Sequence, residues 1–319
     1  MPKAKNPEAP AQAIENPSDV KALHRAAARK WNANALQGEG RRRIWQQSLT
    51  IRQHINKKIC GKPLGPMNAG LDMELKRRLN GRTLGRGISI GCGRAAKEIA
   101  LLEQGVVEKF DCFDLATEPL AIARRTAAEK GLEDRIVLSD ADAFENARET
   151  YDLVYWNSSL HHMLDVEAAV KWSREHLSPN GVLYVREYAG PSRFQFTDRQ
   201  IELATRFRAA LPRRFLLNPA GKAYLPDQPK IIPLETIIAS DPTESVDSAK
   251  IVPSLEAIFP EAQLWRLGGA IYYVAMTGIL GNFDEEDDQD WLRMALAVDD
   301  MCIELGENMI IGALAMMDG

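Results

Sequence analysis

The chain has 319 residues, an apolar fraction of 45% and a formal net charge of −4. This length suffices for one large α/β domain with additions, or for two domains, and the composition is typical of a chain that buries a real core. No apolar run approaches the roughly 18 residues of a membrane span. Residues 1–17 are rich in Pro, Ala and charge and lack the apolar stretch of a secretory signal, so we expect a disordered tail there.

Charge is distributed unevenly along the chain. Residues 1–86 hold 18 Lys and Arg against 6 Asp and Glu, a balance of +12, whereas residues 281–319 hold 11 acids and one base. Solvated helix faces are one explanation, and attraction of an anionic substrate or nucleic acid to the basic region is the other. The four cysteines form no CxxC pair, which predicts a reduced, cytoplasmic protein without disulfides or a metal site.

The first predicted elements are helices. Ser18 or Asp19 is suited to cap a helix, a second helix is expected near 41–59, and a short third one at 71–79 follows a Gly/Pro-rich loop. We expect residues 18–80 to form a helical lid that packs over the bound ligand and, together with residues 190–250, closes its pocket.

From Gly87 the pattern alternates between strand and helix. Apolar runs predict five strands, and helical segments separate them. The predicted strands are 88–90, 109–113, 135–139, 151–156 and 182–187, and the predicted helices are 95–104, 119–130 and 166–177. Right-handed crossovers then give an open, doubly wound, mostly parallel sheet, with ligands at the carboxyl ends of its strands. We place the core of this α/β fold in residues 81–189 and 251–281.

Three further segments follow the fifth strand. Residues 190–250 are dotted with prolines, contain one helix at about 197–211, and are expected to cover the substrate. Two runs, 263–267 and 271–276, are joined by Gly268-Gly269 and predict a β-hairpin that adds an antiparallel edge strand. Residues 282–319 hold an acidic segment and a helix at 291–309, which either pairs the subunits of a homo-oligomer or covers the sheet.

A glycine turn after the first strand carries the clearest functional signal. Gly91-Cys92-Gly93 allows the backbone to approach a ligand closely, and Asp114 ends the next strand, where a carboxylate binds the two hydroxyls of a ribose. Taken alone, this turn also fits a dinucleotide site. The predicted hairpin, the polar residues 139–142 and the segment 157–162 favour a different nucleoside.

With these segments the chain resembles the class I S-adenosylmethionine-dependent methyltransferases over about residues 72–280. The resemblance implies a Rossmann-like sheet of seven strands with an antiparallel last strand, and S-adenosylmethionine as the cofactor. The pattern departs from the family at Ser89, where an acid is usual, and at Ala95, where the last glycine is usual. The resemblance implies these cofactor-binding residues: Gly91, Cys92, Gly93, Asp114, Leu115, Asp140, Ala141, Asp142 and Asn157.

Methyl transfer is an in-line displacement, so the enzyme mainly aligns the acceptor and excludes water. A hydroxyl acceptor also needs a base, because a protonated hydroxyl is a poor nucleophile. His161 follows the fourth strand and Glu187 ends the fifth, and we expect one of them to be that base. We expect His162, Tyr188 and Arg193 to bind the substrate.

Two sequence motifs that mark particular classes of methyl acceptor are missing from this chain. The segment Asn157-Ser158-Ser159-Leu160 replaces the Asn/Asp-Pro-Pro-aromatic motif that the family uses to methylate amino groups of bases, and clustered acids for magnesium are not identifiable. Residues 187–196 and 241–246 are similar to bacterial glycan-associated methyltransferases. These features favour O-methylation of a small-molecule or carrier-linked acceptor, such as a sugar or related metabolite. A nucleic-acid-directed methyltransferase that uses the basic N-terminal region and a non-catalytic cofactor-binding scaffold are the alternatives.

Overall fold

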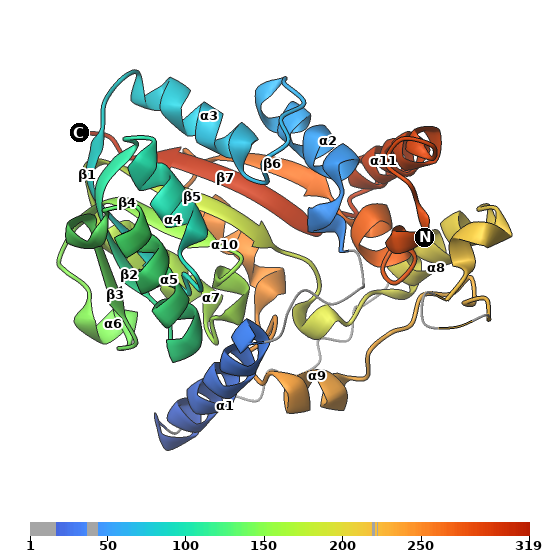
Figure 1. The fold of residues 1–319 in the computed structure, drawn as a ribbon, viewed down its shortest axis with the longest axis horizontal. Coiled ribbons are helices and arrows are strands. Elements are labelled where there is room, and N and C mark those ends of the chain that lie inside the picture. The colour runs from blue at the N-terminus through green and yellow to red at the C-terminus, as the bar shows by residue number, and fades with distance from the viewer. Residues whose placement is uncertain (1–16, 37–43, 219–220, 222) are drawn as a thin grey trace.

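The computed structural model describes residues 17–36, 44–218, 221 and 223–319. In this part of the chain one seven-stranded sheet has the order β3-β2-β1-β4-β5-β7-β6 (Figure 1). β7 is antiparallel to both of its neighbours, and the other six strands run parallel, as predicted. The strands are β1 (Leu84–Ile90), β2 (Val107–Phe113), β3 (Ile136–Ser139), β4 (Tyr151–Asn157), β5 (Leu177–Tyr188), β6 (Gln263–Gly268) and β7 (Ile310–Met316).

Helices cover both faces of the sheet. Leu153 and Tyr155 of β4 pack in a cluster with residues of α2–α5 and α11, whereas Val154 and Trp156 pack in a second cluster with α6, α7 and α10. Side chains alternate along a strand, so a central strand covered on both faces is apolar throughout. The helices are α1 (Pro17–Leu36), α2 (Leu49–Cys60), α3 (Ala69–Leu79), α4 (Ala96–Glu103), α5 (Thr117–Glu129), α6 (Ala143–Asn146), α7 (Val166–Glu175), α8 (Asp198–Ala209), α9 (Leu234–Ser240), α10 (Ile251–Ile258) and α11 (Gln289–Glu304).

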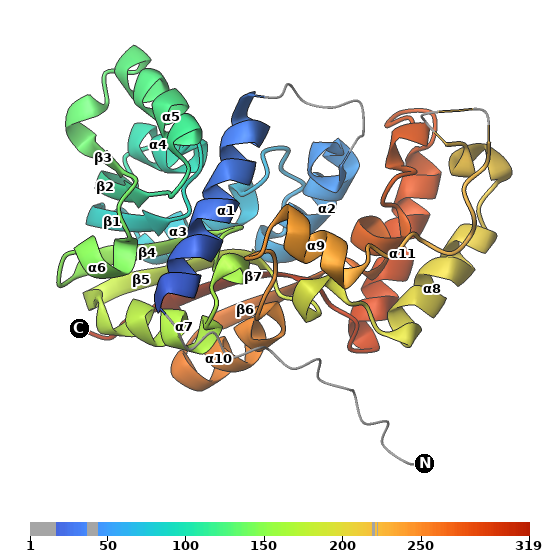
Figure 2. The same cartoon turned by 90° about the horizontal axis from the view of Figure 1, so that it is seen from below.

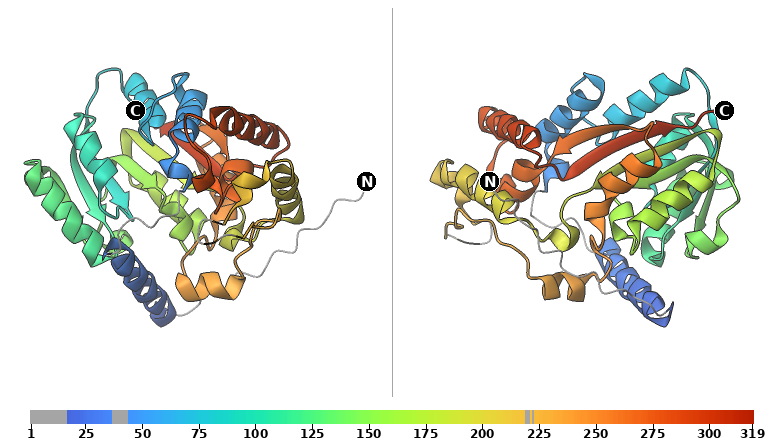
Figure 3. Two further views of the ribbon diagram at one scale, coloured as in Figure 1. Left: turned by 45° about the vertical axis from the view of Figure 1, so that its right-hand side comes forward. Right: turned by 180° about the vertical axis from the view of Figure 1, so that it is seen from behind.

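The N-terminal helices divide into two parts. α2 and α3 contact each other and the β6–β7 side of the sheet, whereas α1 contacts α5. Figures 1 and 3 place α1 on the opposite side of the molecule from α2 and α3, and Figure 2 shows it extending from α5 toward α7. Residues 1–16 of the expected tail and the basic residues 41–43 lie outside the described residues. None of the helices described is long and apolar enough to cross a bilayer.

The predicted β-hairpin is wrong. β6 ends at Gly268, and residues 270–275 form a π-helical turn instead of a returning strand. Gly268 and Gly269 have φ angles of 92° and 116°, and the Asp299 carboxylate accepts backbone N–H groups of Gly269 and Ile271 (3.0 and 2.7 Å). This carboxylate redirects the chain out of the sheet. The strand that pairs with both β5 and β6 is β7, which begins at Ile310, directly beyond the helix predicted at 291–309, and was not predicted. The observed helix α11 ends earlier than predicted, at Glu304.

Asp299 is also expected to make stability depend on pH. Its side chain is buried, and burial outweighs the backbone donors and raises its pKa to about 6. A carboxyl group whose pKa is higher in the folded state stabilises that state most when protonated, and this contribution falls as pH rises from about 4 to about 6. Denaturant titrations should therefore show the free energy of unfolding of the wild type falling about 1 kcal/mol more between pH 5 and pH 7 than that of Asp299→Asn. Parallel curves for the two proteins would contradict this account.

Candidate functional site

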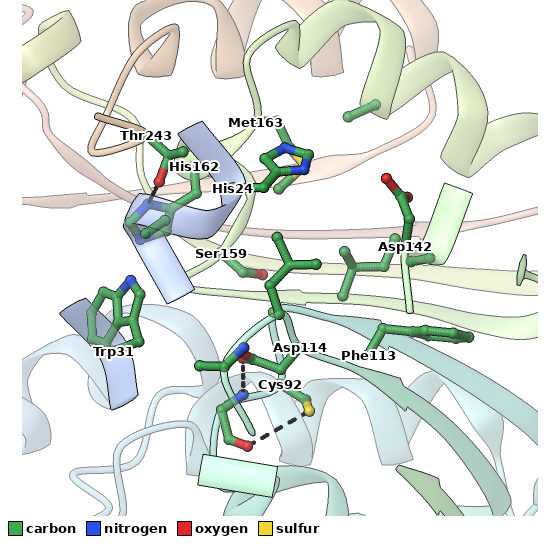
Figure 4. Close-up of a pocket in the computed structure, with 18 of the residues that line it drawn as sticks. His24, Trp31, Cys92, Phe113, Asp114, Asp142, Ser159, His162, Met163 and Thr243 are labelled. Carbon is green, nitrogen blue, oxygen red and sulfur yellow. Dashed lines mark hydrogen bonds between the residues drawn. The ribbon is translucent and has the colours of Figure 1, made fainter. Parts of the chain in front are cut away.

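A cavity of about 900 Å³ lies at the carboxyl ends of the parallel strands, where a doubly wound sheet binds ligands. Six segments of the chain wall it, and Figure 4 shows His162 and Thr243 at one end and Phe113 and Asp142 at the other. Of the three N-terminal helices, α1 contributes residues to the described lining, whereas α2 and α3 contribute none. The lining includes Val20, His24, Ala27, Ala28, Trp31, Gly91, Cys92, Gly93, Lys97, Glu98, Phe113, Asp114, Leu115, Ala141, Asp142, Phe144, Asn157, Ser158, Ser159, His162, Trp172 and Thr243.

The glycine turn after β1 is shaped by close approach and by Asp114. Gly91 has a φ of 72°, and a Cβ added there would lie 2.7 Å from the Cβ of Ser159, so a larger residue is excluded. The Asp114 carboxylate accepts the backbone N–H of Gly93 at 2.7 Å and of Ala116 at 2.8 Å. Burial outweighs these two donors and raises the pKa of Asp114. The turn and the acid predicted from sequence therefore meet in one wall of the cavity, together with Cys92.

The loop after β3 matches the prediction only in part. Ala141 and Asp142 line the cavity, and the Asp142 side chain caps α6 by accepting the N–H of Phe144 at 2.9 Å. Asp140 is exposed and does not belong to the lining. Leu115 lines the cavity while remaining partly exposed to solvent.

Two charged residues of α4 that line the cavity, Lys97 and Glu98, were not predicted from the sequence. Lys97 donates to Asn157 Oδ1 at 2.6 Å, and Glu98 accepts the hydroxyl proton of Ser89 at 2.7 Å. Burial lowers the pKa of Lys97 and raises that of Glu98. Glu98 thus brings a carboxylate to Ser89, the position where the family usually has an acid. Their place in the first turn of α4, directly after the glycine turn, was the available signal.

His161 and Glu187 form a buried ion pair outside the cavity lining. His161 Nδ1 lies 2.5 Å from Glu187 Oε1, and Glu187 Oε2 accepts the backbone N–H groups of Ser159 and Leu160. Burial lowers the pKa of His161, but Glu187 and Glu244 outweigh it and raise this pKa to about 10. Burial by itself would raise the pKa of Glu187, but the positive charge of His161 outweighs burial, so this pKa lies below its usual value. This arrangement argues against the expectation that either residue is the base, because both are charged and enclosed.

His162 lies in the cavity wall instead, and a hydrogen-bond chain fixes its ring. Thr243 Oγ1 donates to Asp241 Oδ1 at 2.7 Å and therefore accepts from His162 Nδ1 at 3.1 Å. Assigned from this network, the tautomer leaves a lone pair on Nε2. Burial and the neighbouring His161 lower the pKa of His162 to about 4. The edge of Trp31 packs against this ring, with 5.7 Å between ring centroids.

Tyr188 and Arg193 lie outside the lining and fix loops. The Tyr188 hydroxyl donates to the carbonyl of Pro191 at 3.0 Å, and Arg193 Nη1 donates to the carbonyls of Pro242 and Glu244. Arg193 thereby fastens the turn that carries Thr243. A role of Arg193 in substrate binding would have to act through that turn, and a role of Tyr188 through the loop at Pro191.

The comparisons with known proteins agree on the type of domain. A family model described as a methyltransferase domain matches residues 88–183. A ubiquinone biosynthesis O-methyltransferase of Brucella anthropi is 27% identical over 170 residues, which are 53% of this chain and 62% of the relative. A ribosomal RNA small subunit methyltransferase C of Actinobacillus pleuropneumoniae is 29% identical over 109 residues, which are 33% of this chain and 32% of the relative. The chain therefore spans less than two thirds of either relative.

The matched residues run from β1 to β5 and contain the glycine turn, Asp114 and the segment after β4. The chain carries a class I S-adenosylmethionine-dependent methyltransferase domain. The geranyl diphosphate C-methyltransferase of Streptomyces coelicolor A3(2) shares the fold, with a TM-score of 0.50 over 95% of this chain and 99% of that chain at 10% identity. The family expected from sequence is confirmed, and S-adenosylmethionine is its cofactor.

The lining of this methyltransferase cavity suits that cofactor. Asp114 offers a carboxylate to ribose hydroxyls, and adjacent Lys97 and Glu98 offer opposite charges to an amino acid's carboxylate and ammonium groups. The hydroxyl oxygen of Ser159 is buried without a hydrogen-bond partner. A buried polar atom without a partner is uncommon in folded proteins, and a bound group that hydrogen-bonds it is one explanation.

Proposed function

We propose that this protein transfers a methyl group from S-adenosylmethionine to a hydroxyl of a small-molecule or carrier-linked acceptor, such as a sugar or related metabolite. The observation that carries the proposal is His162, whose Nε2 lone pair belongs to a cavity wall shared with Ser159 and Thr243. A hydroxyl must lose its proton as it attacks the methyl carbon, and a lone pair at this wall assists that loss. The ubiquinone O-methyltransferase relative supports a hydroxyl acceptor.

We propose that the cofactor lies along the lining from Asp142 to Lys97. Asp114 would accept the ribose hydroxyls, Ala141 and Asp142 would flank the adenine, and Lys97 and Glu98 would hold the amino-acid end. When bound, the cofactor supplies an electrophilic methyl group. The chain's own part is to orient the two reactants and to exclude water, which α1 assists by covering the cavity.

The cofactor assignment predicts a selective loss of affinity. Lys97→Ala should weaken S-adenosylhomocysteine about tenfold, because a charged hydrogen bond contributes roughly 1.5 kcal/mol or more. The variant should bind 5′-methylthioadenosine, which lacks the amino-acid end, within about twofold of the wild type. Calorimetric titration of both ligands measures this difference. Lys171→Ala, an exposed lysine paired with Glu167, is the matched control. An equal loss for both ligands would contradict the assignment.

We propose that His161 and Glu187 act as positioning residues. Glu187 holds the backbone N–H groups of Ser159 and Leu160, and thus fixes the turn that presents His162 to the cavity. Three hydrogen bonds to one buried carboxylate make this turn rigid. Both residues therefore contribute to the site through His162 rather than by touching the acceptor.

A nucleic-acid acceptor is the second candidate, favoured by the ribosomal RNA methyltransferase relative and the basic N-terminal region. Several of the described basic side chains already have partners: Lys58 pairs with Asp300, and Arg78 pairs with Glu74. They belong to α2 and α3, which contribute no lining residue in the described part of the chain. We therefore rank this candidate below the small-molecule acceptor.

Methyl transfer from isotope-labelled S-adenosylmethionine tests the proposal directly. Sugar nucleotides, glycolipids, phenols and RNA should be compared, with RNA binding titrated across salt concentrations because phosphate contacts give a steep salt dependence. We expect label on a hydroxyl of a small or carrier-linked acceptor. Label found on RNA alone would favour the second candidate, and no transfer to any acceptor would favour a scaffold.

A further inference from the structure

Three side chains of the kinds that bind metal ions converge beside the cavity, at the wall that His162 forms. His161, His162 and Glu244 each offer one ligand atom, and these atoms lie within 4.8 Å of one another. The two histidines belong to the turn after β4, and Glu244 belongs to the turn fastened by Arg193. The fold therefore brings together residues that are some 80 positions apart in the chain.

Hydrogen bonds orient the first imidazole. Its Nδ1 faces the Glu187 carboxylate at 2.5 Å, and its Nε2 lies 3.5 Å from Glu244 Oε1. Without an ion this ring is protonated, so an ion that binds Nε2 must replace the proton that faces Glu244 and release it to solvent. Glu187 is itself held by the backbone of Ser159 and Leu160. A carboxylate that binds the far nitrogen of a histidine and leaves the other nitrogen for the ion is the usual arrangement around metal-binding histidines.

The second imidazole is oriented in the same manner by different groups. Thr243 and Asp241 hold Nδ1 of His162 and leave its Nε2 lone pair available. The ring centroids of His161 and His162 are 4.3 Å apart, so both rings serve one small volume. His162 and Thr243 line the cavity, which gives an ion placed here access to the acceptor.

We propose that His161, His162 and Glu244 form a site for a divalent transition-metal ion that binds the acceptor's hydroxyl oxygen. Two imidazoles and one carboxylate suit zinc, iron, cobalt or manganese better than magnesium, which prefers oxygen ligands. Three protein ligands leave coordination positions open for a substrate atom. An ion here lowers the pKa of a bound hydroxyl. The inference rests on the proposed hydroxyl acceptor and names the means of its activation.

Lys30 of α1 competes for this site. Its ammonium group lies 3.3 Å from Glu244 Oε2 and 3.4 Å from Asp241 Oδ2, where it supplies the positive charge that the ion would bring. Two cations that share one carboxylate repel each other, so an ion must displace Lys30. Lys30→Ala should therefore tighten metal binding several-fold, an effect opposite to that of losing a ligand.

Calorimetric titration of the chelator-treated, full-length protein with zinc and cobalt chlorides tests the site. We expect one tight equivalent in the wild type, at least tenfold weaker binding in His162→Ala and in Glu244→Gln, and a 10- to 100-fold loss in Glu187→Gln. The bound cobalt should show no absorption band from thiolate ligation, which excludes Cys92 and Cys112 as its ligands. His176→Ala, whose ring stacks on Trp172 away from this cluster, is the matched control.

Two results of the titrations would overturn the site. One is a wild type that binds no equivalent of either metal, and the other is binding that survives in both His162→Ala and Glu244→Gln. Circular dichroism and thermal melting show whether each variant is folded, and Lys30→Ala offers a test in which binding improves. Methyl transfer that proceeds unchanged in chelator would contradict the metal site but support the proposed function. Metal binding without methyl transfer to any acceptor would support the metal site but contradict the proposed function.

Discussion

Replacing Asp114 by alanine should weaken S-adenosylmethionine binding about 100-fold. The carboxylate accepts the N–H groups of Gly93 and Ala116, so its removal loosens the glycine turn as well as the proposed ribose contact. Hydrogen bonds to charged groups contribute roughly 1.5–3 kcal/mol each, and about 2.7 kcal/mol corresponds to a 100-fold change in Kd. Calorimetric titration of the purified variant measures the change.

Asp140→Ala is the matched control for this prediction. Asp140 belongs to the same set of acids expected from sequence, but it is exposed and lies outside the cavity lining. Its replacement should leave the Kd within about twofold of the wild type, as expected of an exposed side chain without a ligand contact. Equal losses in the two variants, or none in Asp114→Ala, would contradict the placement of the cofactor.

Replacing His162 by alanine should lower kcat about 100-fold or more while leaving cofactor affinity nearly unchanged. Loss of a group that assists proton removal typically costs this much. The expectation is the same whether the Nε2 lone pair acts on the acceptor directly or through a bound ion. Steady-state kinetics with a saturating acceptor, together with titration of S-adenosylhomocysteine, separate the two effects.

His176→Ala serves as the control here too, because its Nδ1 pairs with the Trp172 carbonyl and its ring lies outside the lining. It should retain the wild-type kcat. A His162→Ala enzyme with more than a tenth of the wild-type kcat would remove this residue from the reaction. Glu187→Gln should then be measured next, because Glu187 fixes the turn that carries His162.

The parallel half of the fold was predictable from sequence because its signals are local. Each strand from β1 to β5 contains a short apolar segment, and Gly131 closes α5 with a φ of 64°, the left-handed conformation that favours glycine. The glycine turn and Asp114 end adjacent parallel strands, so their meeting follows from topology alone.

The antiparallel part was not predictable in this way. The run after Gly269 has the composition of a strand, yet a distant carboxylate, Asp299, bonds its first N–H groups and turns it aside. β7 follows α11 after a turn at Gly306, whose φ is 87°, and its place between β5 and β6 depends on partners far along the chain. In the segment after Gly269, tertiary contacts overrode local propensity.

The site divides along the same line. Residues at or directly after the strand ends, such as Gly91 and Asn157, line the cavity as expected. His161 and His162 are neighbours in sequence, and the direction of each ring depends on Glu187 and Thr243, which lie far along the chain. A sequence cannot show which of two adjacent histidines is enclosed by carboxylates and which faces a cavity.

The measurement that tests the account most directly is transfer of a labelled methyl group by the full-length protein, with the acceptor and the modified atom identified by mass spectrometry. We predict one methyl group added to a hydroxyl of a small or carrier-linked molecule, one S-adenosylhomocysteine released for each, and loss of both products in His162→Ala. Transfer to RNA alone, transfer to a nitrogen or carbon atom, or full activity in His162→Ala would contradict it.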